Sequence, residues 1–282
     1  MELITTRDAM QRFARGQRAA GRRIAFVPTM GNLHRGHLAL VEQAAGLADA
    51  VVVSIFVNPL QFDRAADLDA YPRTLEADLA ALEPLGVAAV FAPPETEMYP
   101  QGRAAEPVLR VPGLEALTAD LEGASRPGHF PGVVTVVKKL FDLVRPQVAV
   151  FGEKDYQQLL VVRHMARALA LPVEIAAGPT VREADGLAMS SRNGYLAPEE
   201  RARAPELYRA LEAAAAAVRA DPGAWPAARA AALARLEGAG FRPDYFELRR
   251  AADLGPAAPG EPLRLLAAAW LGPARLIDNV PV

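Results

Sequence analysis

Up to about residue 176, short and nearly continuous apolar runs alternate with longer segments in which apolar residues recur every three or four positions. The first pattern predicts buried β-strands and the second predicts amphipathic α-helices. This alternation is typical of a parallel, doubly wound sheet with helices on both faces. We therefore predict a Rossmann-like α/β domain over residues 1–176, with its ligands at the carboxyl ends of the strands. Strands are expected at residues 22–27, 49–57, 86–93, 147–152 and 173–178, and helices at residues 37–48, 73–85, 113–124, 132–144 and 156–170.

The pattern changes after residue 177. A turn-rich segment leads into two alanine-rich helices, expected at about residues 199–219 and 225–238. Three strand-like runs follow at residues 243–251, 262–270 and 274–282, and we expect them to pair antiparallel. These elements predict a smaller α+β C-terminal domain over residues 177–282, which we interpret as a lid.

The composition restricts the compartment and the chemistry. The 282 residues contain no cysteine, which excludes disulfides, thiolate metal sites and thiol nucleophiles. No apolar stretch reaches the ~18 residues of a membrane span. The N-terminal segment also lacks the apolar core of a secretory signal. We therefore expect a cytoplasmic protein that does not bind a membrane.

The balance of charges is close to neutral. The net charge is −2, so the chain has no basic field that would attract nucleic acid, and no nucleic-acid partner is expected. Of the 31 basic residues only Lys138, Lys139 and Lys154 are lysines. A GC-rich genome or a hot habitat would each produce this preference for arginine, and both explanations stay open. Under either one, a lysine at a special position is informative.

The segment PTMGNLHRGH lies between an expected strand and an expected helix. The first turn of a helix offers unpaired N–H groups and a positive dipole end, which suits an anion. Gly31 and Gly36 allow backbone to come close to a ligand, and we expect His34 and His37 to face that anion. Structural histidines and a metal site are the alternatives, although the pair has neither the H-E-x-x-H spacing nor an obvious third ligand.

Neutral amides follow the next expected strand, in the segment SIFVNPLQF. Asn58 and Gln61 are suited to binding hydroxyl and carboxylate groups without adding charge. The alternative is ordinary turn chemistry, because Asn-Pro commonly begins a turn. Further along, Arg126 and His129 precede a helix in the segment RPGHFPGV. They could contact an anion or belong to a mobile loop with incidental charges.

A lysine opens the helix that follows the strand at residues 147–152. Asp155 suits the N-cap of that helix. Lys154 opposes the helix dipole, and a point charge that reaches phosphate oxygens would explain its presence. Gln158 lies one turn further on the same face. Later in the chain, Ser190–Arg192 lie in a turn-rich segment that could close over phosphates, with a serine-rich linker as the alternative.

Five segments together resemble the pantoate–β-alanine ligases, a family of the nucleotidylyl-transferring superfamily with an H-x-G-H-type signature. The segments PTMGNLHRGH, SIFVNPLQF, RPGHFPGV, FGEKDYQQL and READGLAMSSRN occur in the family's order and spacing, and the resemblance covers essentially the whole chain. It implies an AMP-forming, C–N bond-forming ligase of pantothenate biosynthesis. The carboxylate of (R)-pantoate would attack the α-phosphate of ATP to give pantoyl-adenylate and diphosphate. The amine of β-alanine would then displace AMP and give pantothenate.

The resemblance also implies residue roles. Gln61 and Gln158 would bind pantoate, and Gln61 would also lie near β-alanine. His37 is the residue that the family marks as catalytic; the other candidate donors to phosphate charge are His34, Lys154, Ser190, Ser191 and Arg192. The implied ATP site comprises Met30, Gly31, Asn32, Leu33, His34, Arg35, Gly36, His37, Gly152, Glu153, Lys154, Asp155, Val181, Met189, Ser190, Ser191 and Arg192.

Magnesium is expected to arrive on the ATP phosphates rather than in a protein cage. Glu76 and Asp78 could act as outer ligands, but acids on a helix surface are usually only solvated, and no protein metal site is predicted. The resemblance further implies a homodimer formed through the N-terminal domain.

Other functions remain open from the residues alone. A nucleotidyltransferase would attach AMP to a phosphate-bearing substrate, which should demand cations where Asn58, Gln61 and Gln158 are neutral. The same feature, with the modest length and the acidic pI, argues against a tRNA synthetase. A non-catalytic nucleotide sensor would need the phosphate-binding loop but no amides around a second pocket.

Overall fold

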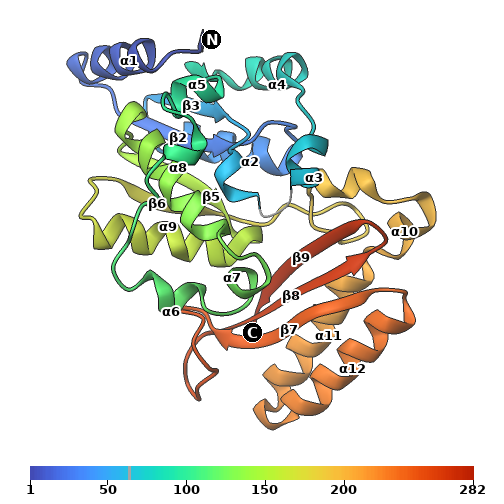
Figure 1. The fold of residues 1–282 in the computed structure, drawn as a ribbon. Helices are drawn as coiled ribbons and strands as arrows, with labels where there is room; N and C mark the ends of the chain where they lie inside the picture. Colours follow the sequence, from blue (N-terminus) through green and yellow to red (C-terminus); the bar gives the residue numbers. More distant parts are fainter. Residues whose placement is uncertain (63–64) are drawn as a thin grey trace. The chain divides into compact units, whose positions relative to one another are not determined.

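A parallel six-stranded sheet organises the first part of the chain (Figure 1). The structure is a computed structural model that describes residues 1–62 and 65–282. The strand order is β1-β4-β3-β2-β5-β6, and every neighbouring pair runs parallel. This confirms the predicted Rossmann-like sheet. The strands are β1 (Glu2–Ile4), β2 (Ile24–Thr29), β3 (Ala50–Ile55), β4 (Ala89–Phe91), β5 (Val148–Gly152) and β6 (Glu174–Gly178).

Alternate residues of the strands bury their side chains on opposite faces of the sheet, as the period of two requires. Val27 and Val150 pack with Leu40 and Val41 of the following helix on one face. On the other face Phe26 and Phe151 both make edge-on contacts with Phe141, at ring-centroid distances of 6.3 and 6.5 Å. The two layers account for the nearly continuous apolar strands of the sequence.

The helices that accompany this sheet are α1 (Arg7–Ala19), α2 (Arg35–Ala45), α3 (Ala65–Ala70), α4 (Leu75–Leu82), α5 (Glu95–Met98), α6 (Leu114–Thr118), α7 (Glu122–Ser125), α8 (His129–Val144) and α9 (Tyr156–Ala168). The sequence pattern predicted neither β1 nor the helices α1, α3 and α5. Strand β1 has only three residues, of which two are exposed, and α1 buries only Met10 and Ala14. The single helix expected at residues 113–124 is two short ones, because Leu121 adopts a φ of 56° and interrupts it.

The strand order reverses at β2. From β2 the chain continues through β3 and β4 to one side, while β5 pairs with the other side of β2. In a doubly wound sheet this reversal marks the place where ligands bind, beyond the carboxyl ends of the two strands. The segments that leave β2 and β5 are the two that carry the most distinctive motifs of the sequence.

A second sheet, antiparallel as expected, lies in the C-terminal part (Figure 1). Its strands are β7 (Arg242–Arg250), β8 (Leu263–Leu271) and β9 (Ala274–Pro281), and its helices are α10 (Pro198–Arg203), α11 (Glu206–Ala220) and α12 (Trp225–Gly238). Helices α11 and α12 cover one face of the sheet, and Leu211, Leu236 and Phe246 are buried between them. The helix expected at residues 199–219 breaks at Pro205, whose ring removes a backbone donor.

The described residues form two compact units. The first contains residues 1–153 and 161–178, and the second contains residues 154–160 and 179–282. The predicted boundary at residue 176 did not anticipate that the start of α9 packs with the C-terminal elements. Two contacts explain this: Tyr156 Oη donates to the Ala251 carbonyl at 2.8 Å, and Asn279 Nδ2 donates to the Lys154 carbonyl at 2.9 Å. No helix in the described part of the chain is both long and apolar enough to cross a bilayer.

Candidate active site

The loop between β2 and α2 is held by a buried carboxylate. Gly31 and Asn32 both have positive φ, 79° and 52°. The oxygens of Asp78 accept the N–H of Asn32 at 2.9 Å and the N–H of Leu33 at 2.7 Å. A Cβ at residue 31 would lie 2.9 Å from Asp78 Oδ2, so only glycine fits there. Asp78, which the sequence suggested only as an outer magnesium ligand or a solvated acid, instead shapes the signature loop.

The two histidines of the signature cap helix α2. His34 Nδ1 accepts the N–H of Gly36 at 3.1 Å, and His37 Nδ1 accepts the N–H of His34 at 3.3 Å. Their rings lie 4.0 Å apart between centroids. Because each Nδ1 is an acceptor, the proton of each neutral ring lies on Nε2. The structural role that the sequence left open is therefore real, and it also gives both rings the tautomer that donates through Nε2.

The amides after β3 lie in the short 3-10 helix η1 (Pro59–Gln61) and at its cap. Asn58 is 1% exposed and bonds entirely inside the protein, so it does not offer itself to a ligand. One of its bonds runs from Nδ2 to Gln61 Oε1 at 3.0 Å. At its other end the Gln61 amide donates from Nε2 to Met30 Sδ at 3.3 Å. The structure thus brings Gln61 against the first residue of the implied ATP site.

Arg126 and His129 both contact the backbone of Gln61. His129 Nδ1 lies 2.8 Å from the Gln61 carbonyl oxygen, and Arg126 Nη2 donates to the same oxygen at 3.3 Å. Arg126 Nη1 also lies 3.2 Å from His129 Nε2. Since a carbonyl can only accept and a guanidinium can only donate, the two contacts fit the tautomer of His129 in which Nδ1 donates and Nε2 accepts. The pair fixes the backbone of Gln61.

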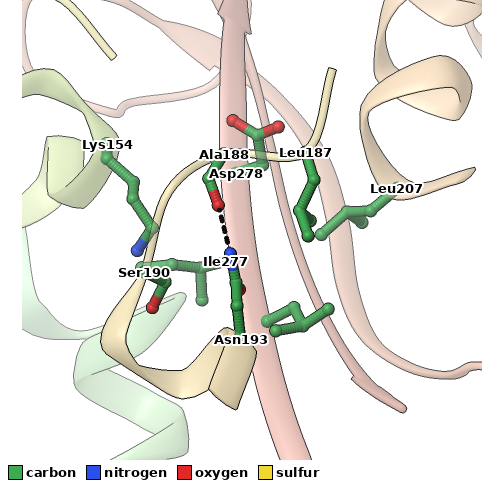
Figure 2. Close-up of a pocket in the computed structure, with 9 residues that line it drawn as sticks. Lys154, Leu187, Ala188, Ser190, Asn193, Leu207, Ile277 and Asp278 are labelled. Carbon is green, nitrogen blue, oxygen red and sulfur yellow. Dashed lines mark hydrogen bonds between the residues drawn. The ribbon is translucent and has the colours of Figure 1, made fainter. Parts of the chain in front are cut away.

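Lys154 follows β5 in the 3-10 turn η4 (Glu153–Asp155), directly before α9. Its ammonium group lies 3.6 Å from Asp155 Oδ2, and its side chain is 18% exposed. Within the second unit Lys154 lines a pocket with Leu187, Ala188, Ser190, Asn193, Leu207, Leu276, Ile277 and Asp278. Figure 2 shows the Lys154 side chain on the same side of this pocket as Ser190.

The turn that carries Ser190–Arg192 is ordered by backbone pairing. Arg182 and Ala188 form an antiparallel bridge, and the N–H of Met189 bonds to the Val181 carbonyl at 3.0 Å. Two separate pieces of the implied ATP site are therefore adjacent. Ser190 then caps η5 (Ser191–Tyr195) by accepting the N–H of Arg192 at 3.2 Å.

A buried ion pair lies next to Lys154 and was not predicted. Asp278 is 4% exposed and accepts both terminal nitrogens of Arg182, at 2.6 and 3.0 Å. The Arg182 guanidinium also lies 3.8 Å over the ring of Tyr208. No spacing in the sequence signals a pair separated by 96 positions.

The implied site residues are divided between the two units. Met30 to His37, Gly152, Glu153 and Gln61 belong to the first unit, while Lys154, Asp155, Gln158, Val181 and Met189 to Arg192 belong to the second. Gln158 lies half-buried on the first turn of α9. Across residues 1–62 and 65–282, no three His, Asp or Glu side chains gather as metal ligands would.

Comparisons with known proteins identify the family. The family model described as Pantoate-beta-alanine ligase matches residues 2–281. The pantothenate synthetase of Thioalkalivibrio sulfidiphilus is 59% identical, over 100% of this chain and 98% of that protein. The corresponding protein of Nitrosococcus oceani is 54% identical over the same shares.

Solved structures agree with these matches. A pantothenate synthetase from Thermus thermophilus is 49% identical, covers 99% of each chain and superposes with a TM-score of 0.89. The pantoate-beta-alanine ligase of Francisella tularensis, solved with beta-gamma ATP and beta-alanine, is 31% identical and has a TM-score of 0.81, over 100% of this chain and 97% of that one. From the fold, the site and these full-length matches, we conclude that the chain belongs to the pantoate–β-alanine ligase family, whose members join pantoate to β-alanine.

Proposed function

We propose that this chain condenses (R)-pantoate with β-alanine in an ATP-dependent reaction, through a pantoyl-adenylate. In the first step a carboxylate oxygen of pantoate bonds to the α-phosphorus of ATP, and the bond to the bridging oxygen breaks, releasing diphosphate. In the second step the amine of β-alanine bonds to the acyl carbon, AMP leaves with the former carboxylate oxygen, and the amine loses a proton. No covalent intermediate with the enzyme is required, which suits a chain without cysteine.

The observation that carries this proposal is the tautomer of the two signature histidines. Both rings use Nδ1 to accept a backbone N–H, so both can donate from Nε2. Donors held in place before the reaction are what stabilises charge that develops on a transferring phosphate. We assign His37 to the α-phosphate in the transition state and His34 to neighbouring phosphate oxygens. Asp78 keeps the loop before them in shape.

We further propose that the second unit supplies the remaining phosphate donors, Lys154, Ser190, Ser191 and Arg192. The pocket that brings Lys154 and Ser190 together supports this assignment. Catalysis then depends on orientation and on charge stabilisation rather than on a nucleophilic side chain.

Pantoate is assigned to Gln61 and Gln158, and β-alanine to the surroundings of Gln61. A neutral amide suits this substrate because its carboxylate must stay nucleophilic, whereas an arginine would hold it too strongly in the ground state. Magnesium would neutralise the phosphates of ATP. No protein ligand is assigned to the ion, and Asp78 is assigned to holding the signature loop through two backbone N–H groups.

The test is AMP release from ATP and pantoate, measured with and without β-alanine, on wild type and on His37→Ala. We expect His37→Ala to lower the rate of adenylation by ~10²–10³-fold, as for the loss of one donor to a developing charge. His164→Ala is the matched control, because that ring bonds only to the Pro112 carbonyl among the described contacts. Turnover of His37→Ala close to that of His164→Ala in both half-reactions would remove His37 from the mechanism.

The resemblance further supports two proposals on the state of the protein, a homodimer formed through the first unit and a cytoplasmic location.

A further inference from the structure

Asn58 is fixed in one orientation by two backbone groups that cannot exchange roles. The N–H of Leu60 donates to Asn58 Oδ1 at 3.2 Å, and Asn58 Nδ2 donates to the Gly132 carbonyl at 3.2 Å. A backbone N–H only donates and a carbonyl only accepts, so the amide of Asn58 cannot be turned over. Its nitrogen therefore faces Gln61.

This orientation is passed on to Gln61. Asn58 Nδ2 lies 3.0 Å from the Gln61 amide, and a donor there requires the oxygen of Gln61, Oε1. The nitrogen of Gln61 is left at the opposite end, beside Met30. Gln61 consequently presents N–H groups, not a carbonyl, next to the signature loop.

Tyr99, the residue directly after α5, also contacts the side chain of Asn58. Its hydroxyl donates to Asn58 Oδ1 at 2.6 Å, the shortest of the bonds to Asn58 described here. The side chain is 1% exposed, and Lys139 lies over the ring at 5.0 Å. Burial, with Glu106 and Glu95 nearby, raises the pKa of Tyr99 well above its usual value. The hydroxyl therefore stays protonated and remains a donor throughout the working pH range.

We propose that Tyr99 is a positioning residue for substrate: through Asn58 it holds Gln61 with its amide N–H groups toward the ligand, so that Gln61 binds the oxygen atoms of a hydroxy acid and not an ammonium group. This rests on the proposed function, in which Gln61 contacts pantoate. The proposal adds Tyr99 and Asn58, which position Gln61 without contacting the ligand. It also specifies that the nitrogen end of the Gln61 amide faces the ligand.

The decisive variant is Tyr99→Phe, which removes the hydroxyl and keeps the ring. Without the Tyr99 hydroxyl, only the Leu60 N–H and the Gly132 carbonyl orient Asn58. Gln61 should then be held less firmly, and pantoate binding should weaken about 3–10-fold. We expect this in KM for pantoate and in calorimetric titration of pantoate into the enzyme without ATP, while kcat and KM for ATP change much less. Thr135→Val is the matched control, because Thr135 also has a buried hydroxyl that bonds within the protein, to the Pro131 carbonyl and the Leu109 N–H. It should lower stability but not pantoate affinity.

Asn58→Asp tests the polarity directly. A carboxylate still accepts from Tyr99 and Leu60, but it cannot donate to Gln61, so Gln61 should turn its nitrogen inward and its oxygen toward the ligand. The variant also loses the bond to the Gly132 carbonyl, so its unfolding by urea is measured beside its pantoate affinity. We expect pantoate affinity to fall about 10–100-fold, because a carbonyl would then face the carboxylate or hydroxyl oxygen.

Three outcomes separate the proposal from the function on which it rests. If Gln61→Ala binds pantoate as wild type does, the assignment of Gln61 fails and the inference with it. If Gln61→Ala is impaired but Tyr99→Phe or Asn58→Asp binds pantoate as wild type does, the function stands and the inference is overturned. Equal losses in Tyr99→Phe and Thr135→Val would show a merely structural effect and would also overturn it.

Discussion

Lys154 is a residue that the sequence signalled through its scarcity and through its position at the start of a helix. It is one of three lysines among 31 basic residues, and its side chain shares a pocket with Ser190 and Asp278. We predict that Lys154→Arg loses nearly as much activity as Lys154→Ala, because a planar guanidinium cannot replace a compact charge in this confined position. Steady-state assays of the two variants with saturating pantoate and β-alanine measure this. A fully active arginine variant would contradict the proposed role.

Asp78 governs the shape of the signature loop without belonging to it. In Asp78→Asn one acceptor oxygen becomes an NH₂ group that faces a backbone N–H, so a buried donor loses its partner. We expect the free energy of unfolding to fall by about 1–3 kcal/mol and KM for ATP to rise. Urea unfolding and ATP kinetics check both effects. Glu76→Gln, an exposed acid on the same helix, serves as control and should change neither quantity.

Among single residues, the sequence identifies those that make up a motif. It misses the residues that hold the motif in its conformation. The chemistry of their side chains and their positions after expected strands select His34, His37 and Lys154 as candidate phosphate donors. Asp78 reaches Asn32 across 46 positions, and Tyr99 reaches Asn58 across 41. Such partners follow from the tertiary fold, which no local pattern contains.

Among the elements, α8 packs unusually close to η1. A Cβ at Gly132 would lie 2.1 Å from the Leu60 carbonyl oxygen, whereas one at Gly16, within α1, would meet nothing within 4 Å. Gly132→Ala must therefore push α8 away from η1 and should destabilise the protein by about 1–3 kcal/mol. Gly16→Ala should stabilise it by about 0.5–1 kcal/mol, since only helix propensity changes. Urea unfolding of the two variants measures the sign of each change in the free energy of unfolding. Equal changes in the two variants would contradict this close packing of α8 and η1.

Helices α11 and α12 are joined by an ion pair that depends on pH. Hydrogen bonds from Arg235 and then Arg209 hold the pKa of Glu206 below its ordinary value of 4.5. A carboxyl group with a lowered pKa stabilises the folded state at pH values above its ordinary pKa. This stabilisation is lost as the pH falls through the lowered pKa. We expect Glu206→Gln to lower the free energy of unfolding by about 0.5–1 kcal/mol at neutral pH. At a pH where the wild-type carboxyl is protonated, we expect no difference.

Unfolding by urea at a series of pH values from neutral to below 4.5 measures whether the free energies of unfolding of wild type and Glu206→Gln become equal. Glu212→Gln on the same helix is the control, since Glu212 has no ion-pair partner in the described part of the chain. A constant difference between Glu206→Gln and wild type at every pH would refute the electrostatic explanation.

Element prediction succeeds where apolar periodicity is long. The strands β2, β3 and β5 and the helices α8 and α9 follow it closely. It fails for β1, which is too short to show a pattern, and where one residue overrides it. Leu121, with its positive φ, and Pro205 each divide a helix that the spacing alone would continue.

For the molecule as a whole, the proposed homodimer is directly measurable. We expect light scattering to give a mass of about 60 kDa, twice the 30.1 kDa of one chain, at micromolar concentration and with or without ATP. A mass of one chain under these conditions would refute the dimer without touching the assignment of the active-site residues.

The packing of residues 154–160 with the C-terminal elements has a consequence for recombination between related genes. A chimera joined at residue 178 inherits the backbone carbonyl of residue 154 and the Tyr156 ring from one parent. Their partners, the Asn279 amide and the Arg264 guanidinium, come from the other. The crossover is therefore tolerated only between parents that keep those two contacts compatible. The fragment of residues 179–282 lacks residues 154–160 of its own unit, so it is a poor module for exchange unless that short segment moves with it.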